Sequence, residues 1–401
     1  MNKKRIIYIG MSGGVDSSVA AALLKKRGYN VVGIYMKNWH STNPKFAHIC
    51  PWEQDLRDAK AVAARLDIPF KVWNFEKQYH DRVVKYFFDE YRRGRTPNPD
   101  VMCNSQIKFN EFFKKAMAEG ADFIATGHYA RVRAIINNQE TCLDLLASIQ
   151  SRNGTVESRR AITKQKEYQL LAGKDENKDQ SYFLWDINKE VLSKTLFPIG
   201  DYLKTEVRKM AKKMNLPVSD KKDSQGICFI GPIDVREYLK TELPIKKGDV
   251  ITIDGQKIGE HEGVWFYTEG QRKGTGSVGG GIPYYVVKKD IKHNKLVVAP
   301  RASKKLFAHG LVANKLNWLI KKNSSPLPRE TLAKWGLLYR GKISVRIRYR
   351  HPAVPATIKV DGDEAKIIFD QPQRAVTPGQ SIVFYKDDLV LGGGIIKKPV
   401  L

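Results

Sequence analysis

Cysteine is scarce in this 401-residue chain, which has only Cys50, Cys103, Cys142 and Cys228. They form no C-x-x-C pair and no Cys/His cluster with zinc spacing, so the pattern predicts no protein-bound metal. Four scattered cysteines in a long chain do not make a disulfide framework either. Each is expected to be a buried apolar residue or a reactive thiol, and Cys50 and Cys142 are interpreted as structural.

Long hydrophobic runs are also missing. No run approaches the ~18 apolar residues that a membrane span needs. Residues 1–4 lead directly into an apolar, strand-like segment without a signal peptide. The sequence therefore predicts a cytoplasmic protein without a membrane partner.

Acidic residues are too few to balance the basic ones. The chain has 69 Lys and Arg against 42 Asp and Glu, which gives a formal charge of +27. Such an excess favours a polyanionic partner, and the nucleotide-binding loop described below makes RNA the expected one. The length predicts two or three domains, and a hydrophobic content of 42% is enough for packed cores.

Strands and helices alternate in the first part of the chain. Hydrophobic patterns predict strands at 5–10, 31–36, 70–75 and 122–126, and helices at 16–27, 53–67, 79–93 and 105–119. This order predicts an α/β fold with a doubly wound parallel sheet that binds ligands at the carboxyl ends of its strands.

The remainder has a different texture. Residues 132–177 are weakly periodic and are interpreted as a loop-like insertion. From residue 232 onward, short β-rich runs alternate with turn signals, among them Asp254-Gly255, Asp361-Gly362 and the glycine triplets 279–281 and 392–394. A strand is expected over 343–350, with Arg346, Arg348 and Arg350 on one face. We therefore predict a catalytic domain at 1–231, a small β-rich domain at 232–298 and a C-terminal β-barrel at 299–401.

The most specific motif joins the first strand to the first helix. It comprises Gly10, Met11, Ser12, Gly13, Gly14, Val15, Asp16 and Ser17. Adjacent glycines let backbone N–H groups approach an anion, and a helix N-terminus follows. The loop has no lysine, so it is not the G-x-x-x-x-G-K-[ST] type. It resembles the pyrophosphatase loop of enzymes that cleave ATP between the α- and β-phosphates; the alternative is an ordinary strand-to-helix turn.

Two cysteines lie in unusual surroundings. Cys103 follows a segment with two prolines that predicts a stiff, non-helical loop, and a helix beginning just beyond it would lower the thiol pKa. Asp100 is close enough in sequence to transfer a proton. Cys228 follows Lys221 and Lys222, which would favour its thiolate. Taken singly, each cysteine could instead be an inert core residue, and Asp100 a turn or cap residue.

Together, these motifs resemble the tRNA-specific 2-thiouridylase family over nearly the whole chain. The matching strings are 10–18, 94–100, 125–129, 178–184, 223–231, 270–274, 377–380 and 391–394. The resemblance implies that ATP adenylates the 2-oxygen of a wobble uridine, in tRNAs for Lys, Glu and Gln, with Mg²⁺ accompanying the ATP. Met36 and Gly127 would contact the nucleotide together with residues 10–17.

The same resemblance assigns the sulfur chemistry and the RNA contacts. Cys228 would carry a persulfide received from a sulfur-relay protein or cysteine desulfurase, and Cys103 would close a disulfide with it, assisted by Asp100. The family positions that meet the target base correspond to Asn98, Pro99 and Asp100. Those that contact tRNA correspond to His128, Lys178, Asp179, Gln180, Arg348, Tyr349 and Gln380.

The sequence departs from the family pattern at three places, and it is also compatible with two other functions. Ser105 stands where the family has a basic residue, Gln225 replaces a small hydroxyl residue, and 132–177 is longer than typical members need. An adenylating ligase would share the loop without needing either cysteine. A non-catalytic RNA-binding protein with a relic nucleotide fold would bind RNA and release no AMP.

Overall fold

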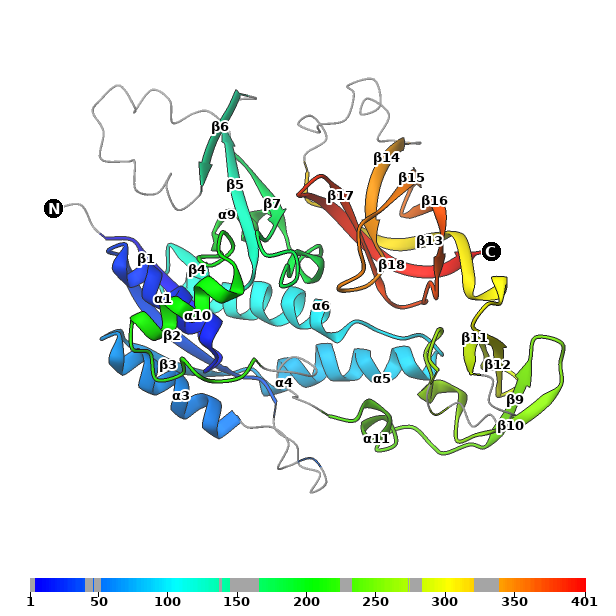
Figure 1. Cartoon of the computed structure of the whole chain (residues 1–401). Helices are drawn as coiled ribbons and strands as arrows, with labels where there is room; N and C mark the ends of the chain where they lie inside the picture. The colour runs from blue at the N-terminus through cyan, green and yellow to red at the C-terminus, as the bar shows by residue number, and fades with distance from the viewer. Residues whose placement is uncertain are drawn as a thin grey trace. The chain divides into compact units, whose positions relative to one another are not determined.

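The computed structural model describes residues 4–39, 46, 52–136, 139–144, 166–223, 233–272, 274, 283–320 and 339–401. The chain forms two compact units. Unit 1 consists of Met1–Arg82, Asp100–Pro232 and Asp387–Leu391, and unit 2 of Val83–Pro99, Ile233–Lys386 and Gly392–Leu401. Figure 1 labels their helices and strands along the chain.

Unit 1 is built on a parallel sheet of five strands in the order β3-β2-β1-β4-β8. The strands are β1 (Ile6–Gly10), β2 (Asn30–Lys37), β3 (Phe70–Asn74), β4 (Phe123–Ala125) and β8 (Thr195–Leu196). Order reverses beside β1, where the chain first builds outward through β2 and β3 and then returns to β4. The predicted doubly wound sheet is therefore confirmed, with its topological switch point at the carboxyl ends of β1 and β4.

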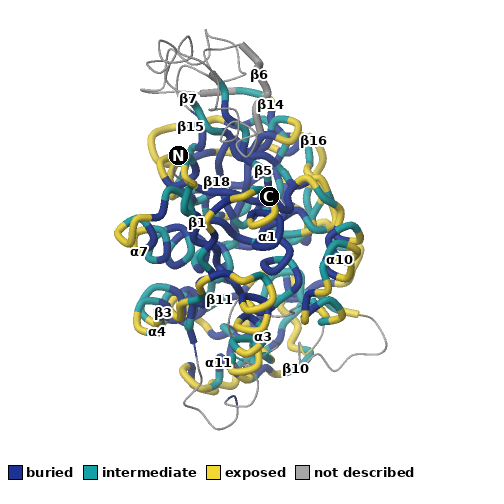
Figure 2. Tube along the Cα trace, turned by 90° about the vertical axis from the view of Figure 1, so that its left-hand side faces the viewer, coloured by how far each residue is buried: buried dark blue, intermediate teal, exposed yellow. Residues whose placement is uncertain are grey.

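The helices of unit 1 follow the predicted alternation. They include α1 (Val15–Lys26), α3 (Trp52–Arg65), α4 (Glu76–Tyr79), α6 (Pro99–Cys103), α7 (Phe113–Ala118), α9 (Lys189–Ser193) and α10 (Lys204–Lys213). Helix α1 is almost wholly buried, because alanine, valine and leucine occupy most of its surface, whereas α3 has a single narrow buried stripe. Figure 2 shows this contrast as a dark blue α1 and a largely yellow and teal α3.

The loop-like interpretation of residues 132–177 is wrong for 132–136, 139–144 and 166–172, which form strands, and is confirmed for 173–177. The antiparallel strands β5 (Ala130–Ile136), β6 (Gln139–Asp144) and β7 (Lys166–Ala172) occupy much of it. In β5 the buried Ala130, Val132 and Ala134 alternate with Arg131 and Arg133, so the strand signal was present in the sequence and was missed. Residues 137–138 and 145–165 lie outside the described part of the chain.

Unit 2 contains α5 (Lys85–Arg92), α11 (Val235–Leu239) and a four-stranded sheet. Its strands are β9 (Gly248–Thr252), β10 (Lys257–His261), β11 (Tyr284–Asp290) and β12 (Lys295–Pro300). The predicted hairpin at Asp254-Gly255 is confirmed: β9 and β10 are antiparallel, and Gly255 takes a φ of 88° that favours glycine.

Six antiparallel strands then close a C-terminal barrel. They are β13 (Phe307–Trp318), β14 (Tyr339–Arg346), β15 (Val354–Asp361), β16 (Glu364–Arg374), β17 (Ser381–Lys386) and β18 (Leu389–Val400). Pairing of β13 with both β16 and β18 completes the barrel. The predicted barrel is thus confirmed.

Two local expectations for the barrel are wrong. The strand predicted over 343–350 ends at Arg346, and Arg350 has a positive φ of 61°, so the last arginines lie in a turn. The glycines at 392–394 lie within β18 and do not separate strands. A Cβ at Gly392 would lie 2.1 Å from the carbonyl oxygen of Asn317, so close strand approach explains that glycine.

Candidate active site

The loop at residues 10–17 turns sharply between β1 and α1. Gly13 has a φ of 72°, and a Cβ there would lie 2.2 Å from the carbonyl oxygen of Asp55. The Ser17 hydroxyl accepts a hydrogen bond from the backbone N–H of Ser12 at 3.2 Å, and the Ser18 hydroxyl donates to the carbonyl of Gly14 at 2.7 Å. The loop is therefore held in a compact turn at the N-terminus of α1, a geometry suited to anions.

Met36 and Gly127, the two distant residues predicted to contact a nucleotide, lie against this loop or the strand that leads into it. A Cβ at Gly10 would lie 2.9 Å from Cε of Met36, and a Cβ at Gly127 would lie 2.6 Å from the backbone nitrogen of Ser17. The parallel pairing of β2 and β4 with β1 brings these segments together. The predicted residues thus gather at one edge of the sheet.

Gly127→Ala is expected to raise the KM for ATP at least about tenfold, because the new methyl group meets loop backbone and displaces it from its binding geometry. Steady-state kinetics at varied ATP concentration would measure the change. Gly120→Ala is the control, since its added Cβ has open space although its φ of 86° strains the backbone. That control should lower the melting temperature and leave KM unchanged; equal KM values for wild type and Gly127→Ala would contradict the assignment.

A basic cluster beside the loop was missed by the sequence reasoning. Nζ of Lys204 lies 2.7 and 2.9 Å from the two carboxylate oxygens of Asp16 and 2.8 Å from Asp223. Arg208 donates to Asp223 at 2.6 Å, and Lys221 donates to the carbonyl of Gly13 at 3.1 Å. The i, i+4 spacing of Lys204 and Arg208 at the start of α10 was the available signal, because it places both cations on one helix face.

Asp223 and Tyr129, both in or beside this cluster, have strongly shifted pKa values. Burial opposes ionisation of Asp223, but hydrogen bonds from Lys178 and Lys204 outweigh it and hold its pKa well below the ordinary value. Burial, followed by the neighbouring Asp16 carboxylate, raises the pKa of Tyr129, whose hydroxyl donates to Asp16 at 2.8 Å. The cluster therefore presents fixed charges of both signs next to the loop.

Cys103 is positioned differently from the prediction. Helix α6 already begins at Pro99, where a proline is favoured because its missing N–H has no partner in the first turn. Asp100 therefore lies in the first turn of α6, and Cys103 is the last residue of that helix. Cys103 is fully buried and runs directly into a π-helical segment, Asn104–Phe112. Cys228, with Gln225, lies outside the described residues, so the geometry between the two cysteines is not assigned.

The predicted RNA-contacting residues of unit 1 hold local structure. His128 is buried, its Nδ1 lies 2.8 Å from the Thr126 hydroxyl, and burial lowers its pKa well below the ordinary value. The buried Asp179 accepts hydrogen bonds from the backbone N–H of Gly173 and of Ser181. The side chain of Gln180 accepts one from the N–H of Tyr129 at 3.0 Å. Lys178 pairs with Asp223 at 2.7 Å and thereby joins this segment to the basic cluster.

The predicted contacts in unit 2 lie at turns around the barrel. Arg348 donates to the backbone carbonyls of Arg374 and Ala375 at 3.0 and 2.7 Å. The guanidinium of Arg350 lies 5.3 Å from the ring centre of Tyr349. Gln380 donates to the backbone carbonyls of Thr96 and Pro97, the two residues before Asn98.

Two further observations concern metals and membranes. Within the ranges that the structure describes, no group of three or more His, Cys, Asp or Glu side chains could hold a metal ion. Among the helices described, none is long and apolar enough to cross a membrane.

The parallel sheet and its loop define a HUP domain, which is followed by a small four-stranded sheet and a C-terminal barrel. Family models match as "tRNA methyl transferase HUP domain" over residues 5–232, "tRNA methyl transferase PRC-barrel domain" over 236–300 and "Aminomethyltransferase beta-barrel domain" over 308–396. Among solved structures, NMN synthetase from Francisella tularensis aligns over 54% of this chain and 66% of that one, with 15% identity and a low TM-score of 0.28.

Curated relatives narrow the class. The chain is 44% identical to the tRNA-specific 2-thiouridylase MnmA of Streptococcus thermophilus over 98% of its own length and 96% of the relative. It is 43% identical, with the same coverage of both chains, to the MnmA of Streptococcus pyogenes serotype M3. The chain belongs to the tRNA-specific 2-thiouridylase family.

Proposed function

We propose that this enzyme uses ATP to replace the 2-oxygen of the wobble uridine of tRNA with sulfur. The observation that carries the proposal is the gathering of residues 10–17, Met36 and Gly127 at one sheet edge, in a chain 44% identical to curated 2-thiouridylases. The formal charge of +27 supports an RNA substrate, because Lys and Arg neutralise phosphates.

The first step activates the base. The uridine 2-oxygen attacks the α-phosphorus of ATP, pyrophosphate leaves, and the poor leaving group becomes an adenylate. Backbone N–H groups of the 10–17 loop bind the phosphates at the N-terminus of α1, and Mg²⁺ accompanies the ATP to neutralise their charge. Lys204 and Arg208 are close enough to the loop to supply further positive charge.

The second step transfers sulfur. A persulfide on Cys228, delivered by a relay protein or cysteine desulfurase, attacks C2, and AMP leaves with the former 2-oxygen. The Cys103 thiolate then attacks Sγ of Cys228, the S–S bond breaks, and the terminal sulfur stays on the uridine. Asp100 assists proton transfer, and an external thiol reductant reopens the Cys103–Cys228 disulfide.

Substrate recognition is proposed for the remaining predicted residues. Asn98 and Pro99 lie against the target base, which must leave the stacked anticodon loop to be read. Contacts from His128, 178–180 and 348–349 orient the tRNA. The chain is divided into its three domains near residues 231 and 298. The acceptors are tRNAs for Lys, Glu and Gln, and the reaction takes place in the cytoplasm.

The decisive experiment is thiolation of unmodified tRNA with ATP, Mg²⁺ and a persulfide source, followed by mass spectrometry of the nucleosides. Wild type should yield 2-thiouridine, and Cys228→Ser should yield none, because a serine hydroxyl cannot carry the transferable sulfur. Cys142→Ser serves as the matched control and should retain activity.

The same assay separates the alternatives. AMP release without sulfur in the tRNA, unchanged by Cys228→Ser, would overturn the proposal and favour an adenylating ligase. RNA binding without AMP release would favour a non-catalytic protein. A methylated nucleoside, formed only with a methyl donor, would support the activity named in the family-model description.

A further inference from the structure

The buried Lys289 contacts Thr96, which lies two residues before Asn98, the first residue proposed to meet the target base. The side chain of Lys289, on β11, is only 1% exposed. Its Nζ donates to the carbonyl of Tyr267 at 2.9 Å and lies 3.4 Å from the hydroxyl of Thr96. Glu269, its carboxylate partner, lies 3.9 Å away. Thr96 also meets Thr268, with 3.2 Å between the two hydroxyl oxygens.

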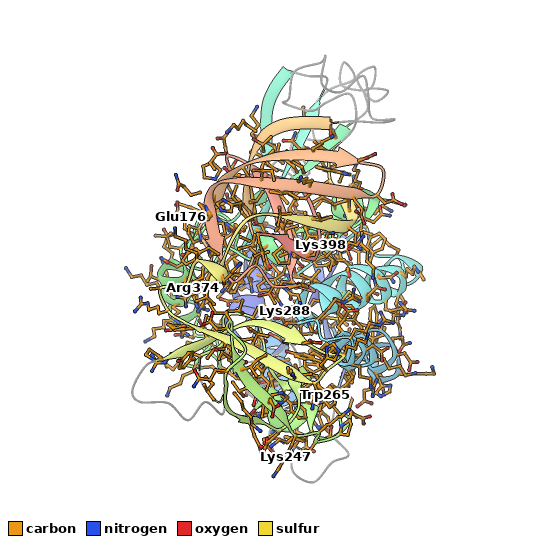
Figure 3. The ribbon with its side chains drawn as sticks, turned by 90° about the vertical axis from the view of Figure 1, so that its right-hand side faces the viewer. Glu176, Lys247, Trp265, Lys288, Arg374 and Lys398 are labelled. Atoms are coloured by element: carbon orange, nitrogen blue, oxygen red, sulfur yellow. The ribbon has the colours of Figure 1, made fainter. Side chains whose placement is uncertain are left out.

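A local irregularity in β11 points this lysine inward. In a regular strand alternate residues share a face, so the buried Val286 would place Lys288 inside and Lys289 outside. A bulge between Val286 and Lys288 shifts the register with β12 and reverses that order. Lys289 is consequently buried and Lys288, labelled in Figure 3, is exposed.

The barrel contacts the backbone of Thr96 and of the next residue, Pro97. The amide of Gln380 donates to the carbonyls of Thr96 and Pro97 at 3.0 and 2.9 Å, and the N–H of Thr96 donates to the carbonyl of Pro378 at 2.9 Å. Gly379 has a φ of 93°, and a Cβ there would lie 2.8 Å from the carbonyl oxygen of Thr96. The barrel turn and the 96–97 backbone are thus in close contact.

Stability alone does not explain the buried pair of Lys289 and Glu269. Burial lowers the pKa of Lys289 and raises that of Glu269, so each group resists ionisation in its site. An apolar pair of similar size would be at least as stabilising. Directed hydrogen bonds, unlike apolar packing, fix the orientation of the chain segment that they hold.

We propose that Lys289 and Gln380 are positioning residues. Lys289 holds the side chain of Thr96 and Gln380 holds the carbonyls of Thr96 and Pro97, so that the next two residues, Asn98 and Pro99, meet the target base in one orientation. The inference rests on the proposed function. It gives Gln380 a role through the protein backbone, in place of the direct tRNA contact expected from the family resemblance. Loss of either grip should therefore slow the reaction of bound tRNA without weakening tRNA binding.

Lys289→Met tests this with Lys288→Met as the matched control, since both remove one positive charge from the same strand. Lys289→Met should lower kcat for thiolation about 10- to 100-fold, because small misplacements of reacting groups have effects of this size. Its Kd for tRNA should stay within about twofold of wild type. Lys288→Met should leave kcat unchanged, and a tRNA Kd raised by Lys289→Met at unchanged kcat would overturn the inference.

Two further variants separate positioning from stability. Glu269→Gln/Lys289→Met removes the unpaired buried carboxylate, so its melting temperature should recover while kcat stays low; recovery of kcat together with stability would overturn the inference. Gln380→Glu places a carboxylate against two carbonyls and should lower kcat, whereas Gln373→Glu on the same barrel should not. Wild type that makes no 2-thiouridine would refute the proposed function itself, independently of these comparisons.

Discussion

Cys103→Ser is expected to reduce 2-thiouridine formation at least about a thousandfold while ATP-dependent activation of the tRNA continues. The thiolate is the attacking species in exchange with a persulfide, and a serine hydroxyl ionises far too weakly to replace it. Single-turnover assays that follow AMP release, tRNA joined to Cys228 through a disulfide, and thiolated tRNA would show the first two without the third.

Burial of Cys103 requires a second variant as control. Because the side chain is fully buried, a serine hydroxyl there needs a new partner and costs about 1–3 kcal/mol of stability if it finds none. Cys103→Ala avoids that cost and should be equally inactive at a melting temperature closer to wild type. Near-normal thiolation by a folded Cys103→Ala enzyme would remove Cys103 from the mechanism.

Lys204→Met is expected to weaken ATP binding about 10- to 100-fold. The side chain is 10% exposed and joins Asp16 of the loop to Asp223. Its loss leaves the Asp16 carboxylate without this cation beside the phosphates, whereas Asp223 keeps Lys178 and Arg208. A hydrogen bond to a charged group contributes about 1.5–3 kcal/mol, and every 1.4 kcal/mol is about tenfold in a binding constant. Isothermal titration with ATP would measure the loss.

Lys212→Met is the matched control for this prediction, because it removes the same charge from the same helix. Lys212 is 65% exposed and pairs with Asp220, so its loss should change neither ATP affinity nor melting temperature appreciably. Equal ATP affinities for Lys204→Met and wild type would show that Lys204 only braces the loop. A fall in both variants would indicate a general effect of net charge.

The parts of the fold that local sequence rules govern were predictable. The strands of the parallel sheet are short apolar runs, and the glycine-rich turn of residues 10–17 needs backbone freedom that few other residues have. The Asp254-Gly255 hairpin likewise follows from turn chemistry alone. These features required no knowledge of distant contacts.

The parts set by distant contacts were not predictable. Two prolines around Asn98 read as a non-helical loop, although Pro99 begins a helix, because proline suits both settings. The basic cluster depends on α10 packing beside α1, so no spacing along the chain relates Lys204 to Asp16. The inward turn of Lys289 depends on a bulge defined only by the pairing with β12.

The π-helical segment after Cys103 affects the direction in which the side chains of the preceding helix α6 face. Each residue of an α-helix turns the chain by about 100°, and a π-helical turn contains one residue more than its α-helical counterpart. The buried Ile107 and Phe112 fix the orientation of the segment itself. Compared with a regular α-helix of the same length, one π-helical turn in 104–112 therefore changes the direction in which Asp100 and Cys103 face by roughly a quarter turn. The direction in which this thiol faces thus depends on the π-helical winding of the segment that follows it.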